Sequence, residues 1–533
     1  MSTNLNVRPY NNKEQLLFPP SIGDYLPKDH LAHVVDEAVD EIDLRPYYKK
    51  IPDVGNPSYH PALMIKIWFY GYATKTYSSR KIEEKIHTDV AFIYLAGMQK
   101  PDFKAISEFR RKNIQELKDS FIDILQICHR LGMTKLCKIS LDSKAIKANV
   151  SASRTYDEKE LIKERKIIEK AIEEYLEKVN QTDEEEDQKY GADKRGNELP
   201  DDIREKEKRI KKMRKIIEQI KQVQEKLKSS DKQKINLTDP DAQFQEDKGK
   251  TIPGYRAHIA VDSKEQVIVA NDVTTEQSDQ PELIPMVDKV IDNIDKIKEQ
   301  TNSIIPNDGT NNKQSPEDET EKDKIKIIAD SGYSSGNNFK ELEKEKYRDR
   351  IDPYIPDQIY QAKERGKRNS PFDKDKFIYD ETSNEFICPA GNKLHYIGNR
   401  TNRSGQIVRI YHCNDCRSCK YFTQCTTSPK GRGIEVSENE YLIKKMREKL
   451  STEDGKKIYT IRKITAEPVF GNLSQNLGFR EFLLRGKEKV KGEFSLMCTA
   501  HNLLKIARFV KELGFTLKEI LNIGNLSPVF DTS

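Results

Sequence analysis

Short apolar runs that end at an acidic residue occur at two distant places in the chain. Residues 326–329 lead directly into Asp330 and then Gly332, and residues 138–141 lead into Asp142. Short apolar runs that stop at turn residues predict buried strands. We therefore expect each aspartate where its strand ends, at the edge of a sheet and facing a cleft.

Two further strand-like runs, 255–261 and 267–273, flank a short polar segment that begins at Asp262. Two such runs joined by a short polar loop predict a β-hairpin. Asp262 then has a turn role, and we leave it out of the candidate site.

The first 130 residues carry the signals of helices, among them a proline at the start of the apolar run after His60. Cationic residues stand in two of these segments, at Arg80, Lys81, Arg110 and Arg111. Short helices with Arg and Lys near their ends suit helix-turn-helix contact with DNA, although packing between helices explains the apolar positions equally well. We expect residues 1–130 to form an all-helical DNA-binding domain.

Apolar residues at four-three-four spacing mark two long segments after Asp142. They are Ile168, Ile172, Tyr175 and Val179 in the first segment and Ile210, Met213, Ile217 and Ile220 in the second. Because this spacing puts each set on one face of a helix, the two faces can pair. We expect an antiparallel helical hairpin, inserted into the fold over residues 151–236.

A second insertion, residues 351–440, combines short strand-like runs with five of the eight cysteines: Cys388, Cys413, Cys416, Cys419 and Cys425. Eight cysteines in so long a chain do not form a disulfide scaffold. With His395 nearby, the five thiols offer ligands for a structural zinc ion. Reduced cysteines that pack a small β-rich insertion explain the same residues, and both interpretations stay open.

The length of 533 residues allows two or three domains. No apolar run reaches membrane-spanning length and the N-terminus lacks the order of a signal peptide, so we expect a cytoplasmic protein without membrane contact. The net charge of +5 is uneven: residues 395–510 hold 22 Lys and Arg against 11 Asp and Glu, which is +11 and leaves −6 elsewhere. A basic segment beside an acidic cleft suits a phosphodiester substrate, but a solvated lysine-rich surface explains the charge equally well.

Glu467 joins Asp142 and Asp330 as a third candidate acid. Turn chemistry explains each aspartate when it is taken alone. Three carboxylates from distant segments, however, match the hard oxygen ligands that Mg²⁺ takes while it keeps positions for water and phosphate. Pro468 disfavours helical geometry for the residue before it, so we expect Glu467 in the first turn of its helix.

Motifs in a fixed order give a more specific indication. Near the N-terminus they are Arg8-Pro9-Tyr10, Phe18-Pro19-Pro20-Ser21 and Pro101-Asp102-Phe103. Later they are Asp239-Pro240-Asp241-Ala242, Ala329-Asp330-Ser331-Gly332-Tyr333, Glu467-Pro468-Val469-Phe470-Gly471 and Gly492-Glu493-Phe494-Ser495. With these motifs the chain resembles, over nearly its whole length, the DDE transposases of prokaryotic insertion sequences, in particular the 1182-like group with an InsH-type N-terminal domain.

The resemblance implies an α/β fold in which residues 136–515 form a ribonuclease-H-like mixed-sheet catalytic domain that contains both insertions. It also implies that Asp142, Asp330 and Glu467 are the catalytic acids and bind Mg²⁺ or Mn²⁺, as two ions. Separations of 188 residues (330 − 142) and 137 residues (467 − 330) exceed what a minimal fold of this kind requires, and the two insertions account for the excess.

Around the third acid the family often has a tyrosine, an arginine and a later lysine that face DNA. Here the candidate DNA contacts are Tyr459, Arg462, Lys487 and Lys489. The two lysines are substitutes, because Ser474 stands seven positions after Glu467 where the family lysine is expected. Ser143 also stands where relatives commonly have glycine.

The function implied is that of a transposase, acting as at least a dimer beside the nucleoid. It would bind the terminal inverted repeats of its insertion sequence, cut a strand at the element's end and join the freed 3′-hydroxyl to target DNA. Two alternatives stay open: a catalytically inactive DNA-binding repressor of its own element, to which the serines at 143 and 474 point, and a nuclease of the same fold without strand transfer.

Overall fold

The structure is a computed structural model that describes residues 21–52, 54, 56–190, 201–229, 233–247, 249–304, 324–366, 370–401 and 407–524. The chain divides into two compact units, one of Met1–Gly132 with Thr499–Ser533 and one of Met133–Cys498. The boundaries that the sequence suggested for the domains and the insertions stay predictions. Within the described residues, no helix combines the length and apolar character needed to cross a bilayer.

In its described part, the N-terminal unit is built from helices, as expected. They are η1 (Ile22–Tyr25), α1 (Leu31–Asp40), α2 (Arg45–Tyr48), α3 (Pro61–Ala73), α4 (Ser79–Thr88), α5 (Val90–Leu95), α6 (Phe103–Lys112), α7 (Ile114–Arg130) and α18 (Leu517–Gly524). Helix α3 is buried on nearly all sides, which is why its sequence is apolar all round. Pro61 occupies its first turn, and the ring of His60 accepts a hydrogen bond from the N–H of Ala62 at 3.2 Å. The proline start signal is therefore confirmed.

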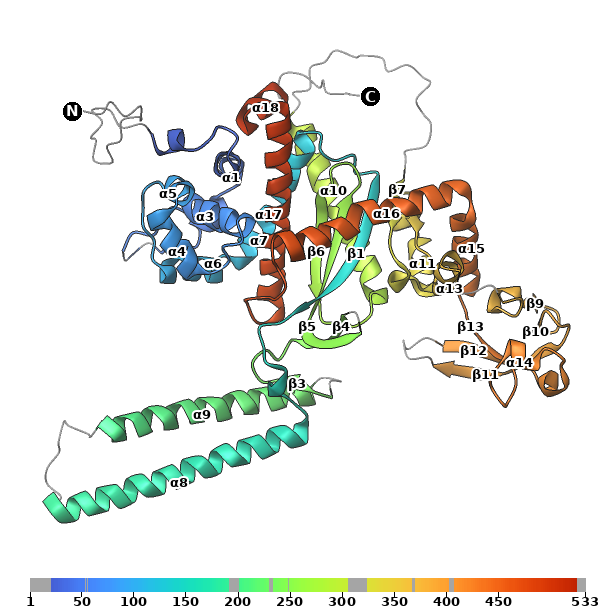
Figure 1. The fold of residues 1–533 in the computed structure, drawn as a ribbon, viewed down its shortest axis with the longest axis horizontal. Coiled ribbons are helices and arrows are strands. Elements are labelled where there is room, and N and C mark those ends of the chain that lie inside the picture. Colours follow the sequence, from blue (N-terminus) through green and yellow to red (C-terminus); the bar gives the residue numbers. More distant parts are fainter. Residues whose placement is uncertain are drawn as a thin grey trace, which may run out of the picture. The chain divides into compact units, whose positions relative to one another are not determined.

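A mixed sheet of six strands lies at the centre of the larger unit (Figure 1). The strands are β1 (Lys138–Lys147), β4 (Gln243–Asp247), β5 (Lys250–Asp262), β6 (Ile268–Thr274), β7 (Ile325–Ile328) and β8 (Ile351–Tyr354). Strand β5 pairs antiparallel with β1, β4 and β6, while β1, β7 and β8 are parallel to one another. Helix α10 (Leu283–Ile304) packs against β5 and β6, and α16 (Glu453–Gly471) crosses β1 (Figure 1). The expected mixed α/β architecture is confirmed, and so is the hairpin that joins β5 to β6.

The remaining helices of this unit connect or flank these elements. They are η2 (Ala152–Arg154), η3 (Gln280–Glu282), η4 (Ser331–Tyr333), α11 (Gly336–Leu342), α12 (Glu345–Arg348), α13 (Gln358–Glu364), η5 (Lys374–Lys376), η6 (Asp415–Ser418), α14 (Phe422–Cys425), α15 (Glu440–Ser451), the π-helical η7 (Asn472–Asn476) and α17 (Lys487–Leu513), which extends beyond the unit.

Strand β1 does not end at Asp142, which corrects the first expectation. Its parallel partner β7 reaches only as far as Ser140, but its antiparallel partner β5 continues to pair up to Lys147. The strand persists because one edge keeps its hydrogen bonds. Asp330 behaves as expected: β7 ends just before it, and its carboxylate accepts a hydrogen bond from the N–H of Gly332 at 2.8 Å.

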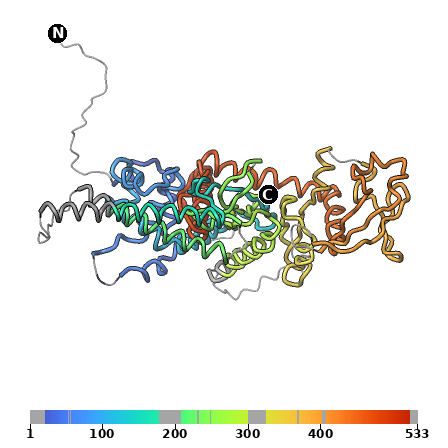
Figure 2. The backbone as a smooth tube through the Cα atoms, turned by 90° about the horizontal axis from the view of Figure 1, so that it is seen from below, coloured from blue at the N-terminus to red at the C-terminus, as the bar shows by residue number. Residues whose placement is uncertain are grey.

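The expected helical hairpin is present as α8 (Glu158–Tyr190) and α9 (Asp201–Lys228), which run side by side (Figures 1 and 2). Its base is closed by the short strands β2 (Thr155–Tyr156) and β3 (Ile235–Asn236). The core near this base contains Leu161, Ile220, Val223, Leu227 and Ile235. Ile172 and Ile210, two of the periodic residues, are also buried.

The cysteine-containing insertion forms a five-stranded antiparallel sheet, in the order β13-β12-β11-β10-β9. Its strands are β9 (Ile378–Asp380), β10 (Glu385–Ile387), β11 (Lys393–Thr401), β12 (Ile407–His412) and β13 (Gly433–Ser437). The segment from Ile351 to Tyr354, which we expected at the start of this insertion, instead pairs with β7 as β8 of the main sheet.

Helix α16 contains Pro468 in its interior, and this corrects the expected position of Glu467. Glu467 lies near the end of α16, not in its first turn. Proline has no N–H to bond to the carbonyl four residues earlier, that of Ile464. The side chain of Gln266, in the β5–β6 loop, donates to this carbonyl at 2.8 Å. A tertiary hydrogen bond thus replaces the one that the proline removes.

Gln266→Ala should lower the free energy of unfolding by about 0.5–1.5 kcal/mol, because the Ile464 carbonyl loses this donor. Pro468→Ala restores the helical N–H, so the same Gln266→Ala change should cost less in that background. Chemical denaturation of the four proteins measures the coupling. An equal cost in both backgrounds would contradict the compensation.

Candidate functional site

The parallel pairing of β1 with β7 brings Asp142 and Asp330 to the same level. Ser140 and Ile328 form the last rung of this ladder. Asp142 stands two residues after Ser140, and Asp330 stands two residues after Ile328. Residues that are two apart in an extended chain point to the same face. The similar strand endings in the sequence therefore correspond to two neighbouring carboxylates.

Helix α16 brings the third acid, Glu467, to this region together with Arg462. The guanidinium of Arg462 lies between two carboxylates, with its Nη1 3.4 Å from Asp142 Oδ1 and its Nη2 2.9 Å from Glu467 Oε1. The side chains of Arg462 and Asp142 are 14% and 16% exposed, whereas that of Glu467 is 49% exposed. Arg462, which we expected at DNA, thus forms ion pairs with two of the three candidate acids.

The electrostatics of Asp142 show that the three acids interact. Burial raises the pKa of Asp142 to about 7; Arg462 opposes this rise, and the charges of Asp330 and Glu467 add to it. Burial would lower the pKa of Arg462, but Asp142 and the other acids hold it above its usual value. Near neutral pH, Asp142 therefore lies close to the boundary between its neutral and ionised forms.

A fourth carboxylate, Asp279, lies beside Asp330 and was missed by the sequence analysis. One Asp279 oxygen and one Asp330 oxygen each lie within 2.9 Å of the point where a Cβ on Gly332 would stand. A Cβ at 332 would therefore push at least one of the two carboxylates out of its place. No spacing in the sequence signals Asp279, since it stands in a polar segment between a strand and a helix.

Ser143 connects Asp279 to the central strand. The hydroxyl of Ser143 donates to Asp279 Oδ1 at 2.7 Å, and Arg256 Nη1 lies 3.4 Å from the same oxygen. Burial raises the pKa of Asp279, while Ser143 and Arg256 oppose the rise. We call Asp142, Asp279, Asp330 and Glu467 the acid cluster. Ser143, which stands where the resemblance led us to expect glycine, therefore has a hydrogen-bonding role in this cluster.

A buried histidine lies behind this cluster. His258 Nδ1 and the hydroxyl of Tyr333 are 2.8 Å apart, and both side chains are fully buried. Burial lowers the pKa of His258 to about 3, so the imidazole is neutral at physiological pH. It supports the turn after Asp330 rather than supplying a charge.

Three further candidates are on the larger unit, and one of them, Tyr459, is near enough to Arg462 to contribute to its electrostatics. Tyr459 is partly buried, and its hydroxyl accepts a hydrogen bond from Gln361 at 3.4 Å. The backbone N–H of Lys487 donates to Asp241 at 3.0 Å. Lys489 is exposed.

The candidates on the N-terminal unit fall into two groups. Arg80 and Lys81 are exposed, and Arg111 is exposed but bonded to Glu108. Arg110 is only 8% exposed, and its guanidinium stacks on the ring of Trp68 at 4.2 Å. This corrects the expectation for Arg110, which is a core residue and is not placed to contact DNA.

The donor chemistry of the acid cluster fits a hard divalent cation. Asp142, Asp330 and Glu467 offer carboxylate oxygens, and the burial of Asp142 makes a compensating positive charge favourable. In the described part of the chain, no set of three or more His, Cys, Asp or Glu side chains stands close enough together to hold a metal ion as it is. Arg462 supplies the positive charge between two of these acids.

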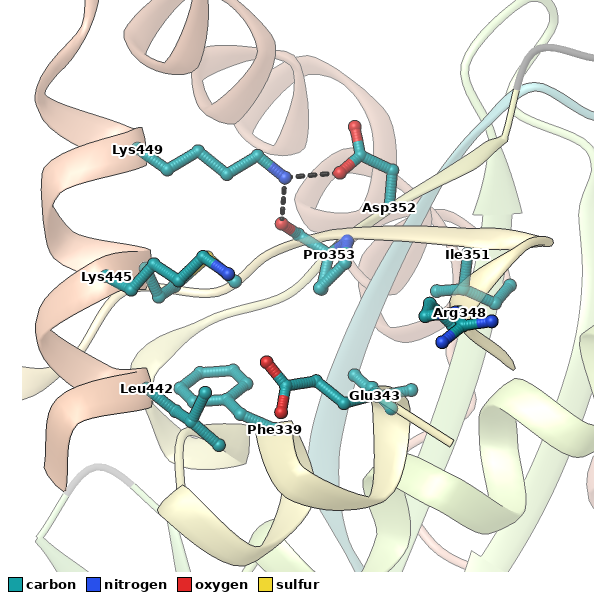
Figure 3. Close-up of a pocket in the computed structure, with 11 residues that line it drawn as sticks. Phe339, Glu343, Arg348, Ile351, Asp352, Pro353, Leu442, Lys445 and Lys449 are labelled. Atoms are coloured by element: carbon teal, nitrogen blue, oxygen red, sulfur yellow. Dashed lines mark hydrogen bonds and ion pairs between the residues drawn. The ribbon is translucent and has the colours of Figure 1, made fainter. Parts of the chain in front are cut away.

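A pocket of about 470 Å³ lies elsewhere on the larger unit, between α11, β8 and α15 (Figure 3). Lys449 reaches across it and donates to Asp352 and, at 2.8 Å, to the carbonyl of Pro353. Its lining includes Phe339, Leu442 and Lys445, and none of the three candidate acids. The acid cluster and this pocket are therefore separate features.

Comparison with known proteins gives two family matches. A model described as a transposase DDE domain matches residues 387–507, which include Arg462 and Glu467. A model described as a transposase domain of the DUF772 type matches residues 20–112. No curated protein and no solved structure matches the chain. The two family matches support a DDE transposase of an insertion sequence.

Proposed function

We propose that this transposase binds the terminal inverted repeats of its own insertion sequence and catalyses metal-dependent DNA strand cleavage and strand transfer. The observation that carries the proposal is the interaction of Asp142 with Asp330, Glu467 and Arg462 at the centre of the mixed sheet. The order of antiparallel β5, central β1 and parallel β7 and β8 supports a ribonuclease-H-like catalytic domain.

Asp142, Asp330 and Glu467 would hold two Mg²⁺ or Mn²⁺ ions. When bound, such ions activate the attacking hydroxyl and neutralise the charge of the reacting phosphate. The protein's own groups prepare this site. Arg462 favours the ionised form of Asp142, and the N–H of Gly332 fixes the carboxylate of Asp330.

Asp279 has a positioning role in this proposal. It holds Ser143, the residue after Asp142, and lies against the glycine that follows Asp330. One carboxylate thus lies against residues next to both catalytic aspartates, Ser143 within β1 and Gly332 after the end of β7. It would keep the two aspartates in position without contacting the substrate.

The structure favours catalysis over the alternative of an inactive repressor. Ser143 is integrated into the acid cluster through Asp279. Ser474 donates to the carbonyl of Phe470 at 2.7 Å and so has a local structural role at the π-helical turn η7. Neither serine removes a carboxylate. A nuclease without strand transfer has the same site, and an assay for joining to target DNA separates it from the proposed activity.

DNA contact would involve both units. Arg80, Lys81 and Arg111 are exposed on the N-terminal helices, and Lys489 is exposed on α17. Tyr459 and Lys487 are further candidates for phosphate contact. Pairing of two element ends requires at least a dimer, and a genomic DNA substrate implies action in the cytoplasm beside the nucleoid.

Asp142→Asn, Asp330→Asn and Glu467→Gln should each lower cleavage of terminal-repeat DNA by at least about 100-fold, because each removes a charged ligand. Binding of the same DNA should remain largely intact, since phosphate contacts by basic residues dominate affinity. Glu453→Gln, at the exposed start of the same helix as Glu467, is the matched control and should keep cleavage. Strong Mg²⁺-dependent cleavage by Asp330→Asn protein would overturn the assignment.

The pKa of Asp142 also predicts how stability depends on pH. The folded protein holds the Asp142 proton up to a pKa of about 7, against 3.8 when unfolded, so folding favours the protonated form. Stability is therefore lost as the pH rises from about 4 to 7. Without divalent metal, Asp142→Asn should be more stable than the wild type at pH 8, by up to about 4 kcal/mol. Thermal melts in chelator should show that the extra stability of Asp142→Asn protein shrinks towards pH 5. A stability difference from the wild type that does not change with pH would contradict the cost of ionising the buried Asp142.

Lys81→Ala should affect DNA binding, whereas Arg110→Ala should affect stability. Loss of Lys81 should leave the melting temperature unchanged and reduce the salt dependence of DNA binding by about one unit of slope, because one phosphate contact is lost. Loss of Arg110 should lower stability by about 1–2 kcal/mol through its stacking on Trp68. Binding titrations at several salt concentrations, with melts, measure both. An Arg110→Ala protein of normal stability that has lost DNA binding would reverse these roles.

A further inference from the structure

Four of the five clustered cysteines line one small cavity in the β-rich insertion. They are Cys388 from the β10–β11 turn, Cys416 and Cys419 around η6, and Cys425 at the end of α14. The cavity has a volume of about 10 Å³. Cys413 is fully buried in the adjacent core and does not line it. The structure thus places four of the five thiols around one space and Cys413 beside one of them, Cys416.

Backbone N–H groups point at two of these sulfurs. The N–H of Asn392 points at Cys388 Sγ at 3.3 Å, and the N–H of Arg432 points at Cys416 Sγ at 3.4 Å. Hydrogen bonds donated to a sulfur stabilise its charged form. Gly391, at φ +85°, makes the tight turn that brings the Asn392 N–H back to Cys388.

A cationic side chain also lines the cavity. The guanidinium of Arg432 forms no ion pair with a carboxylate among the residues that the structure describes, and its Nε is buried without an acceptor. A zinc ion bound by four thiolates carries a net charge of about −2. Arg432 is placed to offset part of this charge.

The insertion has little else to hold it together. Its core contains six buried residues: Phe377, Leu394, Tyr411, Cys413, Cys416 and Ile434. All cysteines are free, so no disulfide links its strands. Small domains with so limited a core usually depend on a disulfide or a metal ion.

We propose that Cys388, Cys416, Cys419 and Cys425 bind one structural zinc ion, separate from the acid cluster. Structural zinc takes four ligands in a tetrahedron. The four sulfurs surround the cavity, but they do not stand at the distances from one another that a bound metal ion requires. The same is true of every other group of three or more His, Cys, Asp or Glu in the described residues. Binding therefore requires rotation about χ1 of the cysteines, whose backbones already place them around one space.

Full-length protein purified without chelator provides the first test. Elemental analysis should find about one zinc per chain. After removal of the zinc, titration with Co²⁺ should give the absorption bands of a tetrahedral thiolate site, a readout that does not depend on transposition. Protein without zinc that also gives no such Co²⁺ spectrum would overturn the proposal, as would iron with acid-labile sulfide, which indicates an iron–sulfur cluster.

Variants then test the choice of ligands. Cys416→Ser and Cys425→Ser should lower the zinc content by at least about fivefold, because each removes one of four thiolates. Cys413→Ala is the matched control: it removes a buried cysteine from the same insertion and should keep the zinc. Zinc that is retained in both ligand variants but lost from Cys413→Ala protein would show that a different set of cysteines binds it.

Discussion

The larger unit depends on holding several carboxylates close together in a partly buried place. Parallel pairing of β1 with β7 fixes Asp142 and Asp330 at one level, and α16 adds Glu467. Neither burial nor like charge favours this arrangement, as the raised pKa of Asp142 shows. Arg462 lowers the electrostatic cost of this arrangement, because its guanidinium contacts Asp142 and Glu467. Arg462 and Glu467 both come from α16. The fold therefore maintains an excess of negative charge that a cation can relieve.

Both insertions leave the central sheet intact because each has its own core. The helical hairpin lies between β1 and β4 in sequence, and its base is fastened by the β2–β3 pair and a small apolar cluster. The cysteine-containing sheet has a second, separate cluster. The entropic cost of a long connection grows only slowly with its length, so self-contained insertions can separate the acids in sequence without separating them in space.

The sequence predicted the elements better than it predicted the roles of single residues. The strands that carry or precede Asp142 and Asp330 were visible because both runs lead into an acid, and the helical hairpin because its periodicity is long, but the end of β1 was predicted wrongly, since β5 keeps it paired to Lys147. The position of Glu467 was predicted wrongly, since the local rule for proline could not account for a donor from a distant loop. Arg110 looked like a surface cation, but only the tertiary structure shows Trp68 beneath it. Asp279 could not be found from spacing, because its partners come from distant parts of the chain, Ser143 from β1 and Gly332 from η4.

The end of α16 departs from regular helical geometry at two nearby places. Pro468 interrupts the hydrogen-bond ladder beside Glu467, and the π-helical turn η7 follows at Asn472–Asn476. A helix with a missing internal bond and a widened turn bends at lower energetic cost than a regular one. The carboxylate of Glu467 consequently stands on a helix end that bends easily, whereas Asp142 lies within β1 and Asp330 directly follows β7. If the distances between the three acids change during a reaction, Glu467 would then move more than the two aspartates.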